Sequence, residues 1–145
     1  MIAAYYRRLT HADRDVQIRA ARAWSVWEGS TLSLHQDPER VKLFGADTYA
    51  IAFARIECHY FINRGFFDRD DQLLLGVEAI RHVPCAIVHG RYDVVTPVKN
   101  AWDLYRAWPL ADLRIVADAG HAMTEPGIIH ELVAAVRRFE HTPAV

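Results

Sequence analysis

The sequence has few cysteines, no long apolar run and no excess of charge of either sign. Two cysteines among 145 residues are too few for a disulfide framework, so Cys58 and Cys85 are expected to be reduced. Apolar runs such as residues 73–75 fall far short of the roughly 20 residues that span a bilayer. A net charge of -1 gives no electrostatic footprint for nucleic acid or an anionic membrane. These absences favour a globular protein with a small or peptide-like partner.

The N-terminal residues, MIAAYYRR, do not follow the charged-then-apolar order of a signal peptide. We therefore expect a cytoplasmic protein. A content of 52% hydrophobic and 24% charged residues is typical of one folded domain and does not indicate disorder.

The residue pattern changes near Pro84, where a helical pattern gives way to a mixed one. Apolar residues recur at helical spacing over residues 16–29 and again over residues 47–64. We therefore predict a helical portion over residues 1–83, followed by an α/β portion over residues 84–145.

Two helix starts are predicted from capping patterns. Thr10 followed by Asp13 resembles a capping box at the start of the first long helix. Thr96 is expected to cap a later helix, with Pro97 at its first helical position.

The second portion contains two short apolar runs, residues 85–89 and 113–116, that favour strands. A helical pattern lies between them, and another covers residues 126–139. Strand, helix and strand at this spacing predict a βαβ unit with parallel strands and a right-handed crossover. Parallel sheets normally contain more strands, so we predict an incomplete α/β fold and a parent protein about twice as long.

Two polar side chains follow the predicted strands. Asp93 lies in the loop after the first strand, and His121 lies in the loop after the second. Loops at the carboxyl ends of parallel strands meet at one edge of a sheet, so the Asp93 carboxylate is expected to hold the His121 imidazole by its Nδ1 proton. Taken singly, either residue is as well explained as an ordinary loop residue.

Two segments resemble the acid and histidine motifs of α/β-hydrolases: Gly90-Arg91-Tyr92-Asp93-Val94-Val95-Thr96-Pro97 and, after it, Gly120-His121. Their residues are most similar to those of the motifs in prolyl aminopeptidases. The resemblance implies a partial α/β-hydrolase fold, with a helical cap segment followed by the last βαβα of the parallel core. In that family the triad runs serine, acid, histidine, which matches Asp93 to the acid and His121 to the general base.

The chain departs from that family in one respect, because it contains no G-x-S-x-G nucleophile elbow. Its only serines are Ser25, Ser30 and Ser33, and none of them follows a predicted strand. The resemblance therefore implies a missing N-terminal half, and we expect the chain by itself to form no acyl-enzyme.

Two carboxylates fall among aromatic residues of the helical portion. Glu57 lies four residues from both Phe53 and Phe61, and Glu28 lies four residues after Trp24. A carboxylate in such surroundings either pairs with a cation or shifts its pKa. The alternative is that both side chains reach solvent or pair with nearby arginines, for which Arg22, Arg55 and Arg64 are the candidates.

The segments Trp24-Ser25-Val26-Trp27-Glu28 and Ala54-Arg55-Ile56-Glu57-Cys58-His59-Tyr60-Phe61 are similar to cap segments of prolyl aminopeptidases. In that family acidic residues hold the free amino end of the substrate. The resemblance implies that Glu28 and Glu57 bind the ammonium of an N-terminal proline, and that Trp27 and Tyr60 help to shape a pocket for its ring.

Other sites have weaker support. No H-E-x-x-H or phosphate-binding glycine motif is present, so neither a metal nor a cofactor is implied. Glu125 is interpreted as a structural residue that favours the dipole of the last helix. Three alternatives stay open: an esterase or epoxide hydrolase, a non-catalytic binding module, and a chain that works only with a separately made N-terminal half.

Overall fold

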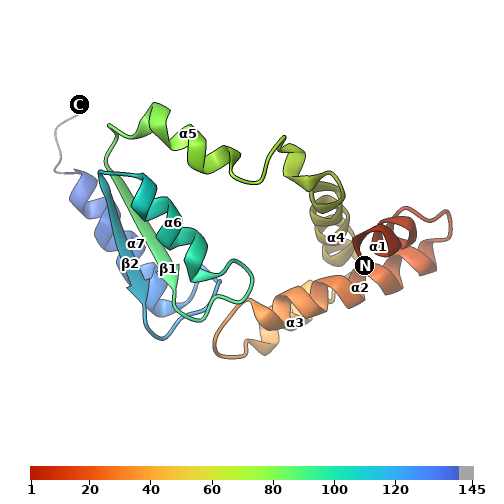
Figure 1. The fold of residues 1–145 in the computed structure, drawn as a ribbon. Helices are drawn as coiled ribbons and strands as arrows, with labels where there is room; N and C mark the ends of the chain where they lie inside the picture. The colour runs from red at the N-terminus through yellow and green to blue at the C-terminus, as the bar shows by residue number, and fades with distance from the viewer. Residues whose placement is uncertain (141–145) are drawn as a thin grey trace. The chain divides into compact units, whose positions relative to one another are not determined.

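The computed structural model of the chain describes residues 1–140, which form two compact units (Figure 1). The first unit comprises Met1–Thr31 and Gln36–Asp70. The second comprises Leu32–His35 and the described chain from Asp71 onward. The predicted division into a cap portion (1–83) and a core portion (84–145) stays a prediction, and its last five residues lie outside the described part.

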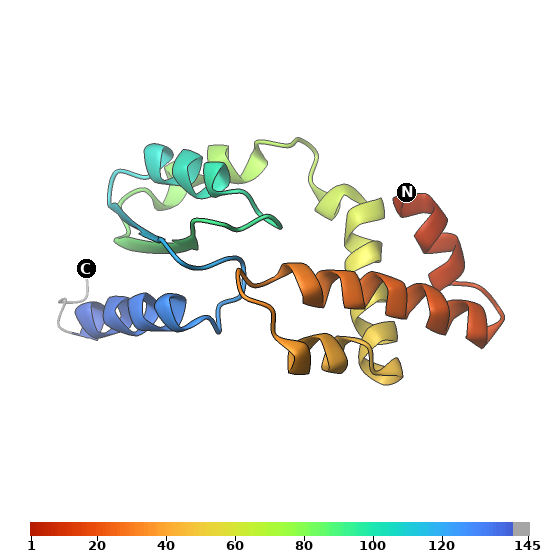
Figure 2. The same ribbon diagram turned by 90° about the horizontal axis from the view of Figure 1, so that it is seen from below.

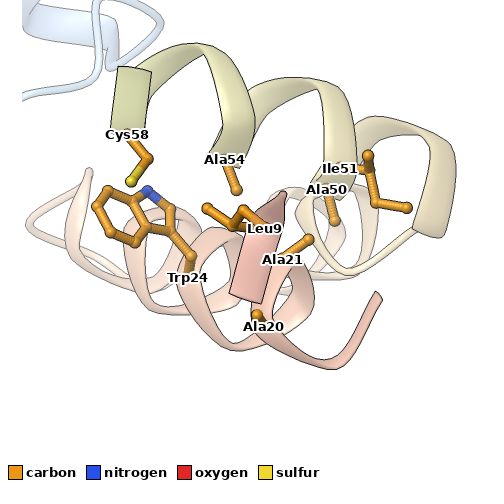
Figure 3. Packing of buried hydrophobic residues seen from close by; sticks show 8 residues of the cluster. All are labelled: Leu9, Ala20, Ala21, Trp24, Ala50, Ile51, Ala54 and Cys58. Carbon is orange, nitrogen blue, oxygen red and sulfur yellow. The ribbon is translucent and has the colours of Figure 1, made fainter. Parts of the chain in front are cut away.

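The first unit is helical. Its elements are α1 (Ile2–Leu9), α2 (Arg14–Thr31), α3 (Pro38–Phe44), α4 (Asp47–Ile62) and the short 3-10 turn η1 (Arg64–Phe66). Helix α2 packs against the other three α-helices. Small side chains on α2 and α4 allow the two helices to approach closely around the Trp24 ring (Figure 3). The buried cluster consists of Leu9, Ala20, Ala21, Trp24, Ala50, Ile51, Ala54 and Cys58.

The start of α2 differs from the prediction. The Thr10 hydroxyl donates to Tyr6 O at 2.7 Å, so Thr10 ends α1, a helix that the sequence pattern did not indicate. Asp13 takes over the expected role, because its Oδ1 accepts the Asp15 N–H at 2.8 Å. The proposed capping box of Thr10 with Asp13 is therefore wrong: Thr10 is engaged by the preceding helix.

The second unit is a mixed α/β body with a two-stranded parallel sheet. Its elements are α5 (Gln72–Ile80), β1 (Cys85–Gly90), α6 (Val98–Ala107), β2 (Ala111–Val116) and α7 (Pro126–Glu140). The strands pair in parallel, with Cys85 opposite Ala111 and Gly90 opposite Val116. Helices α6 and α7 contact both strands from opposite faces (Figure 2). The predicted βαβ unit is confirmed, as is the last helix.

The prediction that Thr96 caps α6 is wrong. Pro97, with ψ 143°, is the N-cap residue of α6, and no side chain caps that helix. The Thr96 hydroxyl instead donates to Asp93 Oδ2 at 2.9 Å, a hydrogen bond that is strengthened by the charge of the acceptor. Thr96 therefore belongs to the loop chemistry and not to the helix start.

Both cysteines are free thiols. Burial raises the pKa of the Cys58 thiol, and the nearby Glu57 charge raises this pKa further. Burial also raises the pKa of the Cys85 thiol. Within residues 1–140, no helix combines the length and apolar character needed to cross a membrane.

Substitution of Gly65 by alanine is expected to lower the free energy of unfolding by about 1 kcal/mol. Gly65 has φ 64°, and a Cβ there would lie 3.1 Å from the Phe67 ring. Gly76 in α5 is the matched control, because a Cβ there meets nothing within 4 Å. Gly76→Ala should raise the unfolding free energy by about 0.5–1 kcal/mol in urea unfolding measurements. Equal effects of the two substitutions would contradict the strain at Gly65.

Candidate functional site

Two loops meet beyond the carboxyl ends of the strands of the second unit. The acid loop, residues 91–97, follows β1, and the histidine loop, residues 117–125, follows β2. Backbone hydrogen bonds join them: Arg91 N donates to Val116 O at 2.9 Å, and Tyr92 N donates to Ala119 O at 3.0 Å. The two loops are thus fastened to each other directly where the sheet ends.

Gly90 makes this close approach possible. A Cβ at position 90 would lie 1.9 Å from Gly120 O and 2.6 Å from Ala119 O, which are backbone atoms that cannot move aside independently. Only glycine allows β1 to end this close to the histidine loop.

The Asp93 carboxylate, on a residue that is 8% exposed, lies at the centre of the contact between the loops. Its Oδ1 accepts the N–H groups of Val95 at 2.9 Å and Thr96 at 2.8 Å. Its Oδ2 accepts the Thr96 hydroxyl at 2.9 Å and lies 2.9 Å from His121 Nδ1. All the hydrogen-bonding capacity of the carboxylate is therefore used to fix its orientation.

These partners also set the charge of Asp93. Burial alone would raise the pKa of Asp93, but the hydrogen bonds from Thr96 and His121 outweigh it, and the pKa lies below its ordinary value. Asp93 is consequently an anion at neutral pH, and an anion at Oδ2 favours the tautomer of His121 that carries its proton on Nδ1.

In this tautomer the Nε2 atom of His121 has a lone pair and can accept a proton. Nε2 makes no hydrogen bond to any described residue, and the His121 side chain is 35% exposed. A proton taken up at Nε2 would be stabilised by the Asp93 charge on the other side of the ring. The pair can therefore act as a general base that is oriented by an acid.

Two further side chains belong to this contact, and the sequence analysis missed both roles. His89 on β1 has its Nε2 2.9 Å from Thr96 O and 3.5 Å from Asp93 Oδ2. Thr96 donates to Asp93 through both its N–H and its hydroxyl. An Asp followed three residues later by Thr is a pattern that favours such a local turn, so Thr96 had a sequence signal. His89 had none, because its approach to Asp93 and Thr96 depends on how the acid loop folds back at the end of β1.

The backbone of the histidine loop is anchored to the segment Leu32–His35. Leu32 O accepts the N–H groups of His121 and Ala122, each at 2.8 Å. Glu125 accepts Gly120 N at 2.8 Å and Leu34 N at 3.1 Å. A contact across about 90 residues of sequence cannot be inferred from local patterns, and nothing in the sequence pointed to residues 32–35.

In the first unit, Glu57 lies against an aromatic side chain as expected. Its Oε2 accepts the indole N–H of Trp24 at 2.5 Å, and the Trp24 ring in turn contacts Tyr5 and Phe61. Glu57 forms no ion pair with any residue in the range 1–140, so the alternative of a pair with Arg55 or Arg64 is not observed. Arg22, another candidate, pairs with Asp47 at 2.6 Å. The carboxylate is therefore held by a neutral donor.

The other expected substrate-binding residues also belong to the first unit. Glu28 on α2 is buried, at 6% exposure, one helical turn after Trp24. Trp27 and Tyr60 are 63% and 52% exposed, which leaves their rings available for contact. A groove of about 550 Å³ is lined by Tyr60 together with Tyr6, Leu9, Thr10, Arg55, Ile56, Cys58 and His59. Neither glutamate lines this groove, so it is not the expected amino-end site.

No three histidine, cysteine or acidic side chains among residues 1–140 lie close enough together to hold a metal ion. The residues described above present an acid–base pair in the second unit and, in the first, a carboxylate held by an indole N–H and a buried glutamate, Glu28.

The chain is similar over nearly its whole length to proteins named proline iminopeptidase. It is 56% identical over 139 residues to a probable proline iminopeptidase of Leptolyngbya boryana, and 50% identical over 139 residues to a proline iminopeptidase of Xylella fastidiosa. A proline iminopeptidase of Arabidopsis thaliana is 51% identical over 135 residues. These matches cover 96%, 96% and 93% of this chain but only 43%, 44% and 36% of the relatives. No protein-family model matches the chain.

Proposed function

Because this chain is homologous over 96% of its length to proteins named proline iminopeptidase, and spans only 43% of such a relative, we propose that it forms the C-terminal part of an enzyme that releases N-terminal proline from peptides. In this proposal Asp93 and His121 are the acid and the general base of a serine triad. Glu28 and Glu57 bind the substrate's ammonium group, and Trp27 and Tyr60 contact its ring. The observation that carries the proposal is the Asp93–His121 contact of 2.9 Å at the end of two parallel strands.

The reaction would proceed by acyl transfer to water, and it needs no cofactor. A serine from outside these 145 residues attacks the carbonyl carbon of the N-terminal proline, and its proton passes to His121 Nε2. Nε2 then gives that proton to the leaving amine, and later accepts one from the water that cleaves the acyl-enzyme. Asp93 keeps the proton on Nδ1 throughout and offsets the charge of the imidazolium.

The fold proposed for this enzyme is an α/β-hydrolase, in which the chain supplies a helical cap segment and the last βαβα of the core. Exposed apolar side chains on α7 favour the proposal that another part of the enzyme packs against this helix. These side chains are Ile129, Val133, Val136 and Phe139, with exposures from 42% to 60%. Surfaces of this kind are rarely left open on a monomer, and we propose a cytoplasmic N-terminal half as their partner.

The experiment is an assay of the purified chain on a proline-linked chromogenic amide, alone and with the N-terminal remainder of the Xylella fastidiosa relative. A covalent chimera, in which this chain replaces the matching 139 residues of that relative, removes the need for the two halves to associate. We expect no release by the chain alone and release by the chimera.

Each outcome bears on a different part of the proposal. Activity of the chain alone would show that a residue other than a triad serine is the nucleophile. Hydrolysis of simple esters by the chimera with no release of proline would favour an esterase. A folded chimera with no activity on the proline amide or on simple esters would favour the hypothesis of a non-catalytic binding module.

Glu57→Gln in the chimera is expected to reduce kcat/KM for the proline amide by about 10- to 30-fold, because a charge-assisted hydrogen bond to the ammonium is lost. Glutamine keeps a carbonyl oxygen that can accept the Trp24 indole N–H, so the substitution removes charge with little change of shape. Initial rates as a function of substrate concentration would measure the effect.

Glu39→Gln is the matched control for this substitution, since Glu39 is exposed on α3 in the same unit. The control should leave kcat/KM unchanged. Hydrolysis of a simple ester, which has no ammonium, should be equally insensitive to both substitutions. A similar loss on the ester would mean that Glu57 supports the fold and not the recognition of the amino end.

A further inference from the structure

Glu125 is a buried carboxylate that the proposed reaction does not use. The residue is 8% exposed and directly precedes α7. Each carboxylate oxygen accepts one backbone N–H, Oε1 from Gly120 at 2.8 Å and Oε2 from Leu34 at 3.1 Å. A carboxylate is unfavourable away from water unless it is hydrogen-bonded, so these two N–H groups explain how it is accommodated.

The two N–H groups flank the backbone of His121. Gly120 directly precedes His121, while Leu34 belongs to the segment whose Leu32 O accepts the N–H groups of His121 and Ala122 at 2.8 Å. Glu125 and Leu32 O together fix three successive N–H groups, those of residues 120, 121 and 122. A Cβ on Gly120 would lie 2.9 Å from Leu34 N, so the contact is as close as a glycine allows.

We propose that Glu125 is a positioning residue for His121: its carboxylate ties Gly120 N to Leu34 N and so holds the histidine loop where Nδ1 meets Asp93. The proposal rests on the proposed function for its consequence in catalysis. Its structural part, the placement of His121, does not depend on that function. This role goes beyond the interpretation of Glu125 as a residue that only favours a helix dipole.

Glu125→Gln tests the proposal with a minimal change of shape. An amide has a single oxygen, so its NH₂ group must face either Gly120 N or Leu34 N, and one of these donors loses its acceptor. The histidine loop should then shift or fluctuate while the strands stay paired. Asp118→Asn is the matched control, because Asp118 is exposed, lies in the same loop and loses the same charge.

The primary measurement uses NMR and amide hydrogen exchange on the full 145-residue chain. In Glu125→Gln we expect the amides of Gly120, His121 and Ala122 to exchange about 10-fold faster, with the β1 amides unchanged. The His121 Nδ1 proton should give a broadened signal. Asp118→Asn should keep the wild-type rates and signal. Wild-type rates and an unchanged Nδ1 signal in Glu125→Gln would overturn the proposal.

The secondary measurement is turnover in the chimera, where Glu125→Gln should reduce kcat by about 10- to 30-fold with KM unchanged. If the chimera is inactive in all forms, the proposed function fails, and the exchange data on the chain still decide the role of Glu125. If the Glu125→Gln variant does not fold, amide exchange in the wild-type chain tests the role of Glu125 instead. Gly120 and Leu34 amides should then exchange about 100-fold more slowly than that of Asp118, and equal rates would overturn the proposal.

Discussion

Asp93→Asn is expected to reduce the turnover of the chimera by about 10⁴-fold. Oδ1 of Asp93 accepts two backbone N–H groups, from Val95 and Thr96, so the asparagine carbonyl oxygen must occupy that position. The amide NH₂ group is then left facing His121 Nδ1, where it can only donate. The imidazole proton is thereby forced onto Nε2, the atom that has to accept the serine proton.

The measurement is kcat on the proline amide, combined with the nitrogen chemical shifts of His121 in the isolated variant chain. These shifts report which ring nitrogen carries the proton. Asp103→Asn is the control, since Asp103 lies on α6 and pairs with Lys99 away from the histidine. Turnover close to wild type, together with an unchanged tautomer, would show that Asp93 does not orient His121.

The same substitution should change how the stability of the chain depends on pH. Because the pKa of Asp93 is below its ordinary value in the folded chain, its ionised form stabilises the fold above the unfolded pKa, about 3.9. That contribution is lost as the pH falls through the folded pKa. The asparagine of Asp93→Asn does not titrate, so the variant lacks this pH-dependent contribution to stability. The difference in unfolding free energy between wild type and variant should therefore shrink as urea unfolding is repeated from pH 7 toward pH 3.

Gly90→Ala is expected to separate the acid loop from the histidine loop. The new Cβ would lie 1.9 Å from Gly120 O, whereas ordinary contacts exceed 3 Å, so the backbone at one of the two positions has to move by about 1 Å. A shift of that size breaks the hydrogen bond of Tyr92 N to Ala119 O and lengthens the Asp93–His121 contact. We expect a loss of about 100-fold or more in kcat.

The stability of the chain should fall in parallel, by about 1–3 kcal/mol, as in other overpacked sites. Urea unfolding and turnover of the chimera measure the two effects. Gly45→Ala is the control, because Gly45 has φ -80° and its nearest neighbour to a Cβ is a Val26 methyl at 3.4 Å. A Gly90→Ala chain with wild-type stability and turnover would show that the two loops do not need this close approach.

Much of the second unit could be predicted from local patterns. Short apolar runs indicated both strands, and helical spacing indicated α6 and α7, because these signals arise within a few neighbouring residues. The parallel pairing followed from the length of the connection. The helix starts were less predictable: Thr10 and Thr96 both have the residue type of a cap, but each hydroxyl has a different acceptor nearby in the folded chain.

The sequence by itself determined the element types of the second unit and the two loops that carry Asp93 and His121, since strand and helix periods are local properties of the chain. It also marked Glu57 as a carboxylate beside aromatic rings. Tertiary structure alone decided that Glu125 and Leu32 anchor the histidine loop and that His89 approaches Asp93. The contacts of Leu32 and Leu34 with the histidine loop join residues about 90 positions apart, and the approach of His89 to Asp93 depends on how the acid loop folds at the end of β1. Their geometry also depends on how closely glycines such as Gly90 let two backbones approach.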